Sequence, residues 1–213
     1  MGLLKSQREI IIGMILGDAY IQPTGKRNAR LRLEHSVKEK EYIFWKYKTL
    51  KNMMQAQPKL IKRFNPFYKK QYSYWRCQSH SSPIFGKLRR KFYSDDRKIV
   101  PDNIKSLLKS TLTLAVWCMD DGYFYKRDKH FFLYLPPYTK EEVKKLKESI
   151  EENFDLHPEF KIKKKGSEMY FLFNKKEKDK LMSIIMRHLL PLFKERFSSN
   201  PVTTSRRVVL SPQ

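Results

Sequence analysis

The hydrophobic pattern begins with a helix that is apolar on nearly every face. Ser6 and Glu9 have the spacing of an N-terminal capping box, and the run Ile10–Leu16 predicts a buried helix that ends near Asp18. Alternating polar and apolar residues then predict a strand at 30–35, which forms a hairpin through the turn at 24–26. Helices are expected next at about 38–54 and 82–93, with strands at about 58–65 and 71–78 between them.

The second half of the chain predicts the same order of elements. An apolar helix at about 110–120 precedes strands at about 123–126 and 130–135 and a helix that opens at a second capping box, Thr139 to Glu142. A hairpin across 165–167 and a helix to about Leu190 follow. The repetition predicts an α+β protein of two pseudo-twofold-related αββαββα halves, 1–97 and 98–213, packed as one functional unit.

The two most apolar helices show the repeat most clearly. Asp18-Ala19-Tyr20 ends the first helix, and Asp121-Gly122-Tyr123 ends the second, 103 residues later. Gly13 and Gly17 lie four residues apart on the first helix, and the second supplies the small Ala115, so the two helices could approach closely. We therefore expect Asp18 and Asp121 to lie side by side.

Two carboxylates at abutting helix ends predict a divalent metal site. A carboxylate at the negative end of a helix dipole is unfavourable unless a cation is near, and carboxylate and carbonyl oxygens are ligands that Mg²⁺ prefers. A Mg²⁺-bound water can hydrolyse a phosphodiester. A single Asp in this position is more often a cap or turn residue, but repetition of both the acid and its context favours the metal. The expected ligands are Asp18 and Asp121, helped by Gly17 and by Asp120 through its carbonyl or from behind the main ligands.

The charge of the chain narrows the choice of partner. The 213 residues include 45 Lys and Arg against 22 Asp and Glu, a net charge of +23, while 40% hydrophobic residues suffice for a packed core. Basic residues alternate with aromatics along strand-like stretches such as 68–76, which suits a sheet facing a nucleic-acid groove better than a membrane-bound helix. Merely solvated strand faces are the alternative. The candidate DNA-contacting residues are Gln22, Lys26, Arg30, Arg32, Lys62, Lys70, Tyr72, Tyr74, Arg76, Tyr125, Lys126, Lys161, Lys163 and Lys165.

Other classes of protein find little support in the sequence. Cys77 and Cys118 are too isolated for a disulfide framework or a Cys-type zinc site, and the five histidines lack metal-ligand spacing. Neither a membrane-spanning run nor a secretory signal is evident, so an intracellular protein is expected.

The segments "IIGMILGDAY" and "LAVWCMDDGY" resemble the two signature motifs of single-chain LAGLIDADG homing endonucleases, in the branch that includes the yeast mitochondrial omega-intron enzyme. The similarity extends over about residues 6–197 and includes "EYIFWKY" and the "KIVP" linker. It implies saddle-shaped antiparallel sheets over the DNA major groove, the two motif helices at the central interface, a monomer, and double-strand cleavage of a long asymmetric site. It also implies that Asp18 and Asp121 bind Mg²⁺ or Mn²⁺.

Two departures from the family pattern predict unequal halves. The family places a lysine after the last helix of each half, facing the active site; this chain has Lys98 and, in the second half, Arg196. The polar run that begins at Gln78 matches a water-ordering patch of the family, and its expected counterpart in the second half, Leu135-Pro136-Pro137-Tyr138, lacks those polar groups. Lys98, Arg196 and Gln78 are thus candidate catalytic residues beside the two aspartates.

These patterns favour a metal-dependent, site-specific DNA endonuclease. Two alternatives stay open: an intron maturase or DNA-binding regulator on the same scaffold that no longer cleaves, with an RNA intron as possible partner of the maturase, and a non-specific nucleic-acid binder driven by charge.

Overall fold

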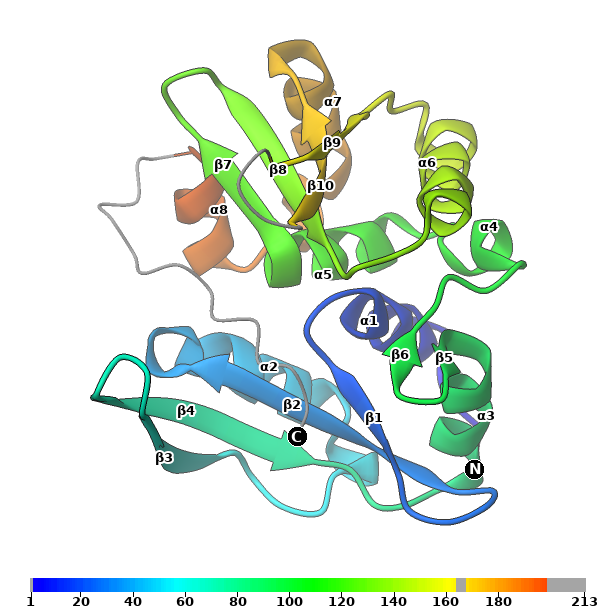
Figure 1. Cartoon of the computed structure of the whole chain (residues 1–213), viewed down its shortest axis with the longest axis vertical. Helices are drawn as coiled ribbons and strands as arrows, with labels where there is room; N and C mark the ends of the chain where they lie inside the picture. Colours follow the sequence, from blue (N-terminus) through cyan, green and yellow to red (C-terminus); the bar gives the residue numbers. More distant parts are fainter. Residues whose placement is uncertain (1, 164–167, 199–213) are drawn as a thin grey trace.

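Two antiparallel sheets flank a central helix pair in the computed structural model, which describes residues 2–163 and 168–198 (Figure 1). The first half contains helix α1 (Lys5–Leu16), strands β1 (Tyr20–Pro23) and β2 (Ala29–Ser36), helix α2 (Lys40–Thr49), strands β3 (Lys59–Asn65) and β4 (Lys70–Gln78), and helix α3 (Pro83–Phe92). Its sheet has the strand order β1-β2-β4-β3. Short 3-10 turns, η1 (Val37–Glu39) and η2 (Lys51–Met53), flank α2, which is therefore shorter than expected.

The second half repeats this order. It contains α5 (Thr111–Asp121), β7 (Gly122–Tyr125), β8 (His130–Leu135), α6 (Lys140–Phe154), β9 (Glu159–Ile162), β10 (Met169–Phe173) and α7 (Lys175–Ile185), and its sheet runs β7-β8-β10-β9. The α+β class and the αββαββα repeat are confirmed. The turn η3 (Met186–His188) and helix α8 (Pro191–Ser198) follow where one continuous helix to Leu190 was expected. The predicted turn at 165–167 lies outside the described residues.

A linker that the hydrophobic pattern did not predict joins the halves. Strands β5 (Tyr93–Ser94) and β6 (Arg97–Lys98) form a small hairpin, and a short helix α4 (Ile104–Leu107) follows. The proposed division between 97 and 98 falls inside β6, and it remains a prediction.

The two predicted capping boxes had different outcomes. In the second, the Glu142 N–H donates to Thr139 Oγ1 at 3.2 Å and the Thr139 N–H donates to Glu142 Oε2 at 2.7 Å, so the prediction is confirmed. The first is wrong, because α1 already begins at Lys5 and the Leu4 N–H donates to the Gln7 side chain.

The α1·α5 pair lies at the centre of one hydrophobic core shared by both halves (Figure 1). The helices approach so closely that a Cβ added at Gly13 would lie 2.6 Å from the Thr113 carbonyl oxygen. The inward side chains of both sheets, such as Leu31 and Leu133, belong to the same core. Within the described residues, no helix is both long enough and apolar enough to cross a membrane.

Candidate active site and DNA interface

The ends of α1 and α5 meet at Gly17. A Cβ added to Gly17 would stand 2.4 Å from Asp120 Cβ, so glycine is required for this approach. The Asp18 N–H donates to Asp120 Oδ2 at 3.3 Å. Asp18 is exposed and Asp121 is half-buried. The structure therefore brings the two motif ends together, as the repeat predicted.

Lys98 supplies a cation at this acidic junction. Its Nζ donates to the Gly17 carbonyl oxygen at 2.5 Å, which places the ammonium group at the C-terminal end of α1. Burial lowers the pKa of Lys98, and the charges of Asp121 and Asp18 oppose that shift. A sequence position 81 residues from Gly17 thus reaches the site because the β5–β6 hairpin folds back onto it.

Asp120 has a different role from the one expected of a metal-binding side chain. It is fully buried, and its Oδ1 accepts hydrogen bonds from Lys46 Nζ at 2.6 Å and from Tyr42 at 2.7 Å. Its Oδ2 accepts the Asp18 N–H described above. The carboxylate is thus engaged by the protein, and the backbone carbonyl remains the group that Asp120 can offer to a metal.

Lys46 and its partners were missed by the sequence analysis. The fully buried Lys46 Nζ also lies 2.9 Å from His35 Nε2, and His35 Nδ1 lies 3.2 Å from Glu39 Oε2. Arg196 donates to Glu39 Oε1 at 2.7 Å. Burial by itself raises the pKa of Glu39, but His35 and Arg196 outweigh it and hold that pKa well below its ordinary value. We call the chain Asp120–Lys46–His35–Glu39–Arg196 the buried charge network. A Lys on a helix that otherwise packs into the core was the available sequence signal.

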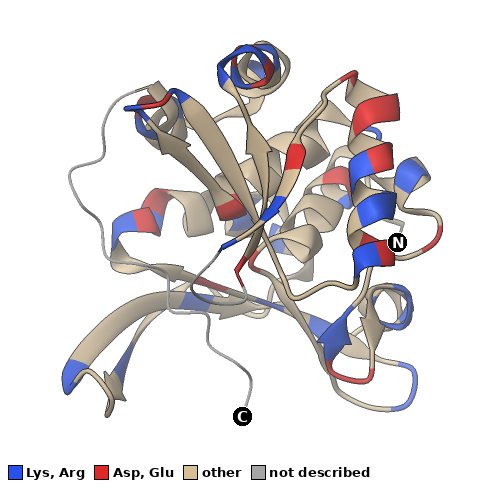
Figure 2. Cartoon of the chain, turned by 45° about the horizontal axis from the view of Figure 1, so that its top comes forward, with Lys and Arg blue, Asp and Glu red and all other residues tan. Residues whose placement is uncertain are grey.

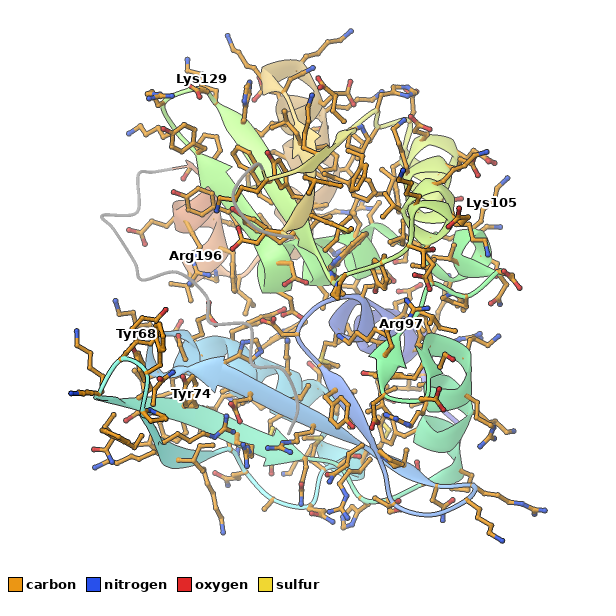
Figure 3. The ribbon with its side chains drawn as sticks, viewed as in Figure 1. Tyr68, Tyr74, Arg97, Lys105, Lys129 and Arg196 are labelled. Atoms are coloured by element: carbon orange, nitrogen blue, oxygen red, sulfur yellow. The ribbon has the colours of Figure 1, made fainter. Side chains whose placement is uncertain are left out.

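Arg196 does not occupy a position equivalent to that of Lys98. It lies on α8, between the halves in Figure 3, where its guanidinium pairs with Glu39 and lies 4.7 Å from the centre of the Phe193 ring. Lys98, in contrast, contacts Gly17 at the helix junction. The expectation that both residues face the active site in the same way is therefore corrected: Arg196 connects to it through the buried charge network.

The donor set at the junction fits a hard divalent cation. Asp18 and Asp121 offer carboxylate oxygens, and Gly17 and Asp120 offer terminal helix carbonyls, while Mg²⁺ commonly completes its shell with water and phosphate oxygens. Over residues 2–163 and 168–198, no group of three or more His, Cys, Asp or Glu side chains could hold a metal ion by itself. The residues thus fit a Mg²⁺ that shares its ligands with bound DNA, and not an all-protein metal cage.

The face of each sheet that points away from the core is here called the outer face. In the first sheet Arg30, Arg32 and Glu34 of β2 alternate with buried Leu31 and Leu33. Pairing sets Gln22 opposite Arg30 and Gln78 opposite Arg32, and it sets Arg76 opposite Glu34. The candidates that the structure places together on this outer face are Gln22, Arg30, Arg32, Lys70, Tyr72, Tyr74, Arg76 and Gln78.

The strand register removes Lys62 from this row. Lys62 pairs with Ser73, one residue out of step with Tyr72 and Tyr74, so its side chain is on the opposite face of the sheet. Arg63, paired with Tyr72, takes the outer-face position. Lys26 is exposed in the β1–β2 loop, beside the outer face.

In the second half Tyr125 and Lys161 lie on the outer face, by their pairing with His130 and Tyr170. Lys126 is exposed just beyond β7, and Lys163, just beyond β9, pairs with Glu168 at 2.7 Å. Lys165 lies outside the described residues. Figure 2 shows lysines and arginines on loops, strand ends and helices of both halves.

The position equivalent to Gln78 was assigned wrongly in the second half. Gln78 pairs with Arg32, and the matching pair in the second sheet is Leu172 with Phe132, because β10 corresponds to β4. Leu135 belongs to β8. The expected loss of the polar group nevertheless holds, since leucine takes the place of glutamine.

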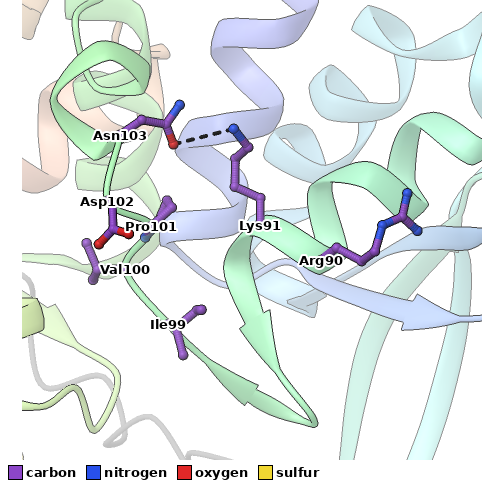
Figure 4. Close-up of a pocket in the computed structure, with 7 residues that line it drawn as sticks. All are labelled: Arg90, Lys91, Ile99, Val100, Pro101, Asp102 and Asn103. Atoms are coloured by element: carbon purple, nitrogen blue, oxygen red, sulfur yellow. Dashed lines mark hydrogen bonds between the residues drawn. The ribbon is translucent and has the colours of Figure 1, made fainter.

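A surface hollow beside the linker is separate from this site. It measures about 380 Å³ and is lined by Arg90, Lys91 and the segment 99–103, with Lys91 Nζ 3.4 Å from Asn103 Oδ1 (Figure 4). None of the candidate catalytic residues lines it.

Comparison with curated proteins finds relatives that cleave or process nucleic acids by name. The chain is 29% identical over 203 residues to the probable intron-encoded endonuclease 1 of Wickerhamomyces canadensis, covering 93% of this chain and 86% of the relative. It is also 27% identical to the cytochrome b mRNA maturase bI2 of Debaryomyces hansenii, over 71% of this chain and 58% of that protein.

Solved structures show the same fold. The homing endonuclease I-WcaI bound to its DNA recognition sequence matches with a TM-score of 0.84 and 25% identity, over 94% of this chain and 89% of that one. I-DmoI in complex with DNA and Mn shares the fold alone, with a TM-score of 0.53 at 12% identity over 87% of this chain and 98% of that one. The model of the LAGLIDADG DNA endonuclease family matches residues 8–181, and the chain belongs to this family.

Proposed function

We propose that this protein is a metal-dependent, site-specific DNA endonuclease that makes a double-strand break at a long, asymmetric target. The observation that carries the proposal is the junction of α1 and α5, where the two motif aspartates and Lys98 meet between two sheets. One chain supplies both halves of the site, which suits a monomer acting on an asymmetric sequence. A DNA target implies a compartment that contains DNA, so we expect the protein to act inside the cell.

The residues at the junction divide the work of hydrolysis. Asp18, Asp121 and the carbonyls of Gly17 and Asp120 would hold Mg²⁺ or Mn²⁺, which supplies an activated water and neutralises phosphate charge when bound. Lys98 places a cation beside the carboxylates, where it can stabilise negative charge that develops on the phosphate. Gln78, on the outer face beside Arg32, offers an amide that can orient water. Arg196 acts as a positioning residue through Glu39.

Asparagine substitution of the aspartates tests the proposal. Asp18→Asn or Asp121→Asn should abolish double-strand cleavage of plasmid carrying the selected target in Mg²⁺, because each removes one ligand charge while keeping the side-chain shape. DNA affinity should be retained or increased, since a negative charge near phosphate is lost. Asp102→Asn, at an exposed linker acid paired with Lys145, is the matched control and should cleave normally. Wild-type cleavage by either aspartate variant would refute the site assignment.

The relative named as a maturase supports one alternative function. A splicing cofactor on this scaffold would bind an intron RNA and would tolerate loss of the metal ligands. If the purified protein left selected duplexes intact but promoted splicing of an intron RNA, the maturase function would replace the endonuclease.

A further inference from the structure

The two outer faces differ in chemistry at equivalent positions. The registers match Tyr20 and Gln22 of β1 to Tyr123 and Tyr125 of β7, since these pairs lie opposite Arg32 and Arg30 in one sheet and opposite Phe132 and His130 in the other. Extending the match across the sheets replaces a polar or charged residue by a ring or an aliphatic side chain several times. The replacements are Gln22 by Tyr125, Arg32 by Phe132, Glu34 by Tyr134, Arg76 by Tyr170 and Gln78 by Leu172.

The rings of the second outer face form one contiguous surface, which we call the aromatic face: Tyr123, Tyr125, Phe132, Tyr134 and Tyr170. Ring centres are 5.2 Å apart for Phe132 and Tyr170, 5.9 Å for Tyr134 and Tyr170, and 6.3 Å from Phe132 to each of the two β7 tyrosines. Tyr123 is 42% exposed, and the others are half-buried. Rings of this number on a sheet face without core above it indicate a contact surface.

The first outer face keeps its guanidinium groups. Arg76 and Arg63 both pair with Glu34 Oε2, at 2.7 and 2.6 Å, so these two are partly neutralised within the sheet. The Arg30 Nε is buried and finds no hydrogen-bond partner among the described residues. Arg30 and Arg32 therefore remain the guanidinium groups of this face with donors to offer a base edge.

Major-groove chemistry connects each face to a different base. Arginine pairs with guanine O6 and N7, whereas apolar and aromatic side chains contact the 5-methyl group of thymine. The rings of the aromatic face pack mostly edge-on or tilted against one another, with interplanar angles of 44° to 73°, so they lie as a joined surface and not as parallel platforms for unstacked bases. Lys161 at the edge of this face keeps the positive charge that a phosphate backbone requires.

We infer that the second sheet recognises its half of the DNA target through thymine methyl groups on the aromatic face, while the first sheet reads guanine through Arg30 and Arg32. The inference rests on the proposed DNA target and adds the base class of each half-site. It predicts a target with a thymine-dependent half and a guanine-dependent half.

The test uses base analogues in a duplex obtained by selection of bound sites from a random library. Uracil replaces thymine in one half-site at a time and removes the methyl group alone, and 7-deazaguanine replaces guanine and removes N7. Uracil should weaken binding roughly three- to fourfold per contacted methyl in one half-site, and 7-deazaguanine should weaken it roughly tenfold in the other. Fluorescence anisotropy at fixed salt measures both.

Protein variants assign each penalty to its sheet, whichever way round the duplex is bound. Phe132→Ala and Tyr123→Ser should remove the uracil penalty and leave the 7-deazaguanine penalty unchanged; Arg32→Ala should do the reverse. Two variants on the aromatic face guard against misfolding of one, and a retained 7-deazaguanine penalty shows that the variant protein is folded.

The outcomes separate the inference from the proposed function. If the wild-type protein selects no duplex, the proposed function fails and the inference fails with it. If it selects a duplex but uracil has no effect, or the uracil penalty persists in both aromatic-face variants, the inference is overturned and the endonuclease stands. Competition by single-stranded RNA that is lost in Phe132→Ala would overturn it in favour of a base-stacking surface.

Discussion

The ion pair between Lys46 and Asp120 fixes the backbone of Asp18, because Asp120 accepts both the Lys46 ammonium and the Asp18 N–H. Both side chains are completely buried. Removing one partner of a buried pair leaves the other charge without compensation, which typically costs about 3–5 kcal/mol. The aspartate that we propose as a metal ligand is thus positioned by a lysine from another helix.

We expect Lys46→Met to lower the free energy of unfolding by about 3–5 kcal/mol. Urea unfolding at neutral pH measures this loss, with the exposed Lys48→Met on the same helix as control. Lys46→Met combined with Asp120→Asn should lose less than the sum of the single variants, because the uncompensated charge is removed. Additive losses would show that the two groups do not interact.

Glu39 makes part of the stability depend on pH. Its folded-state pKa is depressed below the ordinary 4.5 by His35 and Arg196, against the opposing effect of burial. A depressed carboxyl pKa stabilises the fold above the unfolded pKa, and that contribution declines as the pH falls below it. We expect the stability difference between wild type and Glu39→Gln to be full at pH 7 and to shrink below pH 4.5. The exposed Glu41→Gln is the control, and a difference independent of pH would contradict the assignment.

At the scale of elements, the approach of α1 to α5 depends on Gly17. A methyl group there would overlap Asp120, with Cβ at 2.4 Å from Asp120 Cβ and 2.6 Å from its Oδ2. Overpacking a tight contact costs about 1–3 kcal/mol, so Gly17→Ala should lower the free energy of unfolding by at least that amount. Gly25→Ala, where an added Cβ meets nothing within 4 Å, should be close to neutral in the same thermal or urea measurement. Equal effects of both variants would refute close helix packing.

At the scale of the whole molecule, a net charge of +23 should make DNA binding strongly salt-dependent. Each neutralised phosphate contributes about −0.9 to the log–log slope of affinity against salt, and comparable proteins contact about 6 to 10 phosphates. We expect a slope between about −5 and −9 by fluorescence anisotropy. A slope shallower than about −3 would exclude engagement of the duplex by both sheets.

The inequality of the halves should appear in the order of strand cuts. Gln78 of the first half is replaced by Leu172, and Lys98 at the junction has no equivalent in Arg196, which is held by Glu39. Misplacement of about 1 Å can slow a reaction on the order of 10²-fold, so nicked circles should accumulate before linear product.

A gel time course on supercoiled plasmid tests this inequality. Leu172→Gln should reduce the nicked intermediate, whereas Arg196→Lys should leave the second cut unchanged, since Arg196 acts through Glu39. Direct conversion of supercoiled to linear plasmid would contradict the asymmetry and leave the endonuclease function intact.

Much of this architecture was predictable because its signals are local or repeat along the chain. The apolar helices ending in Asp18 and Asp121 recur with the same neighbours, and strand alternation around Arg30 has a period that sequence alone reveals. Gly13 and Gly17 at helical spacing likewise predicted the close approach that the structure has.

The tertiary structure decided the features that depend on contacts between distant segments. Asp120 changed from a potential ligand to a partner of Lys46, 74 residues away, because packing of α2 buries both charges together. Strand register separated Lys62 from Arg63 and matched Gln78 to Leu172, since a shift of one residue reverses the face on which a side chain lies. The sequence by itself determined the repeat, the paired acids and the affinity for an anionic partner. Their surroundings were decided by burial and register, which exist only once the two halves have folded against each other.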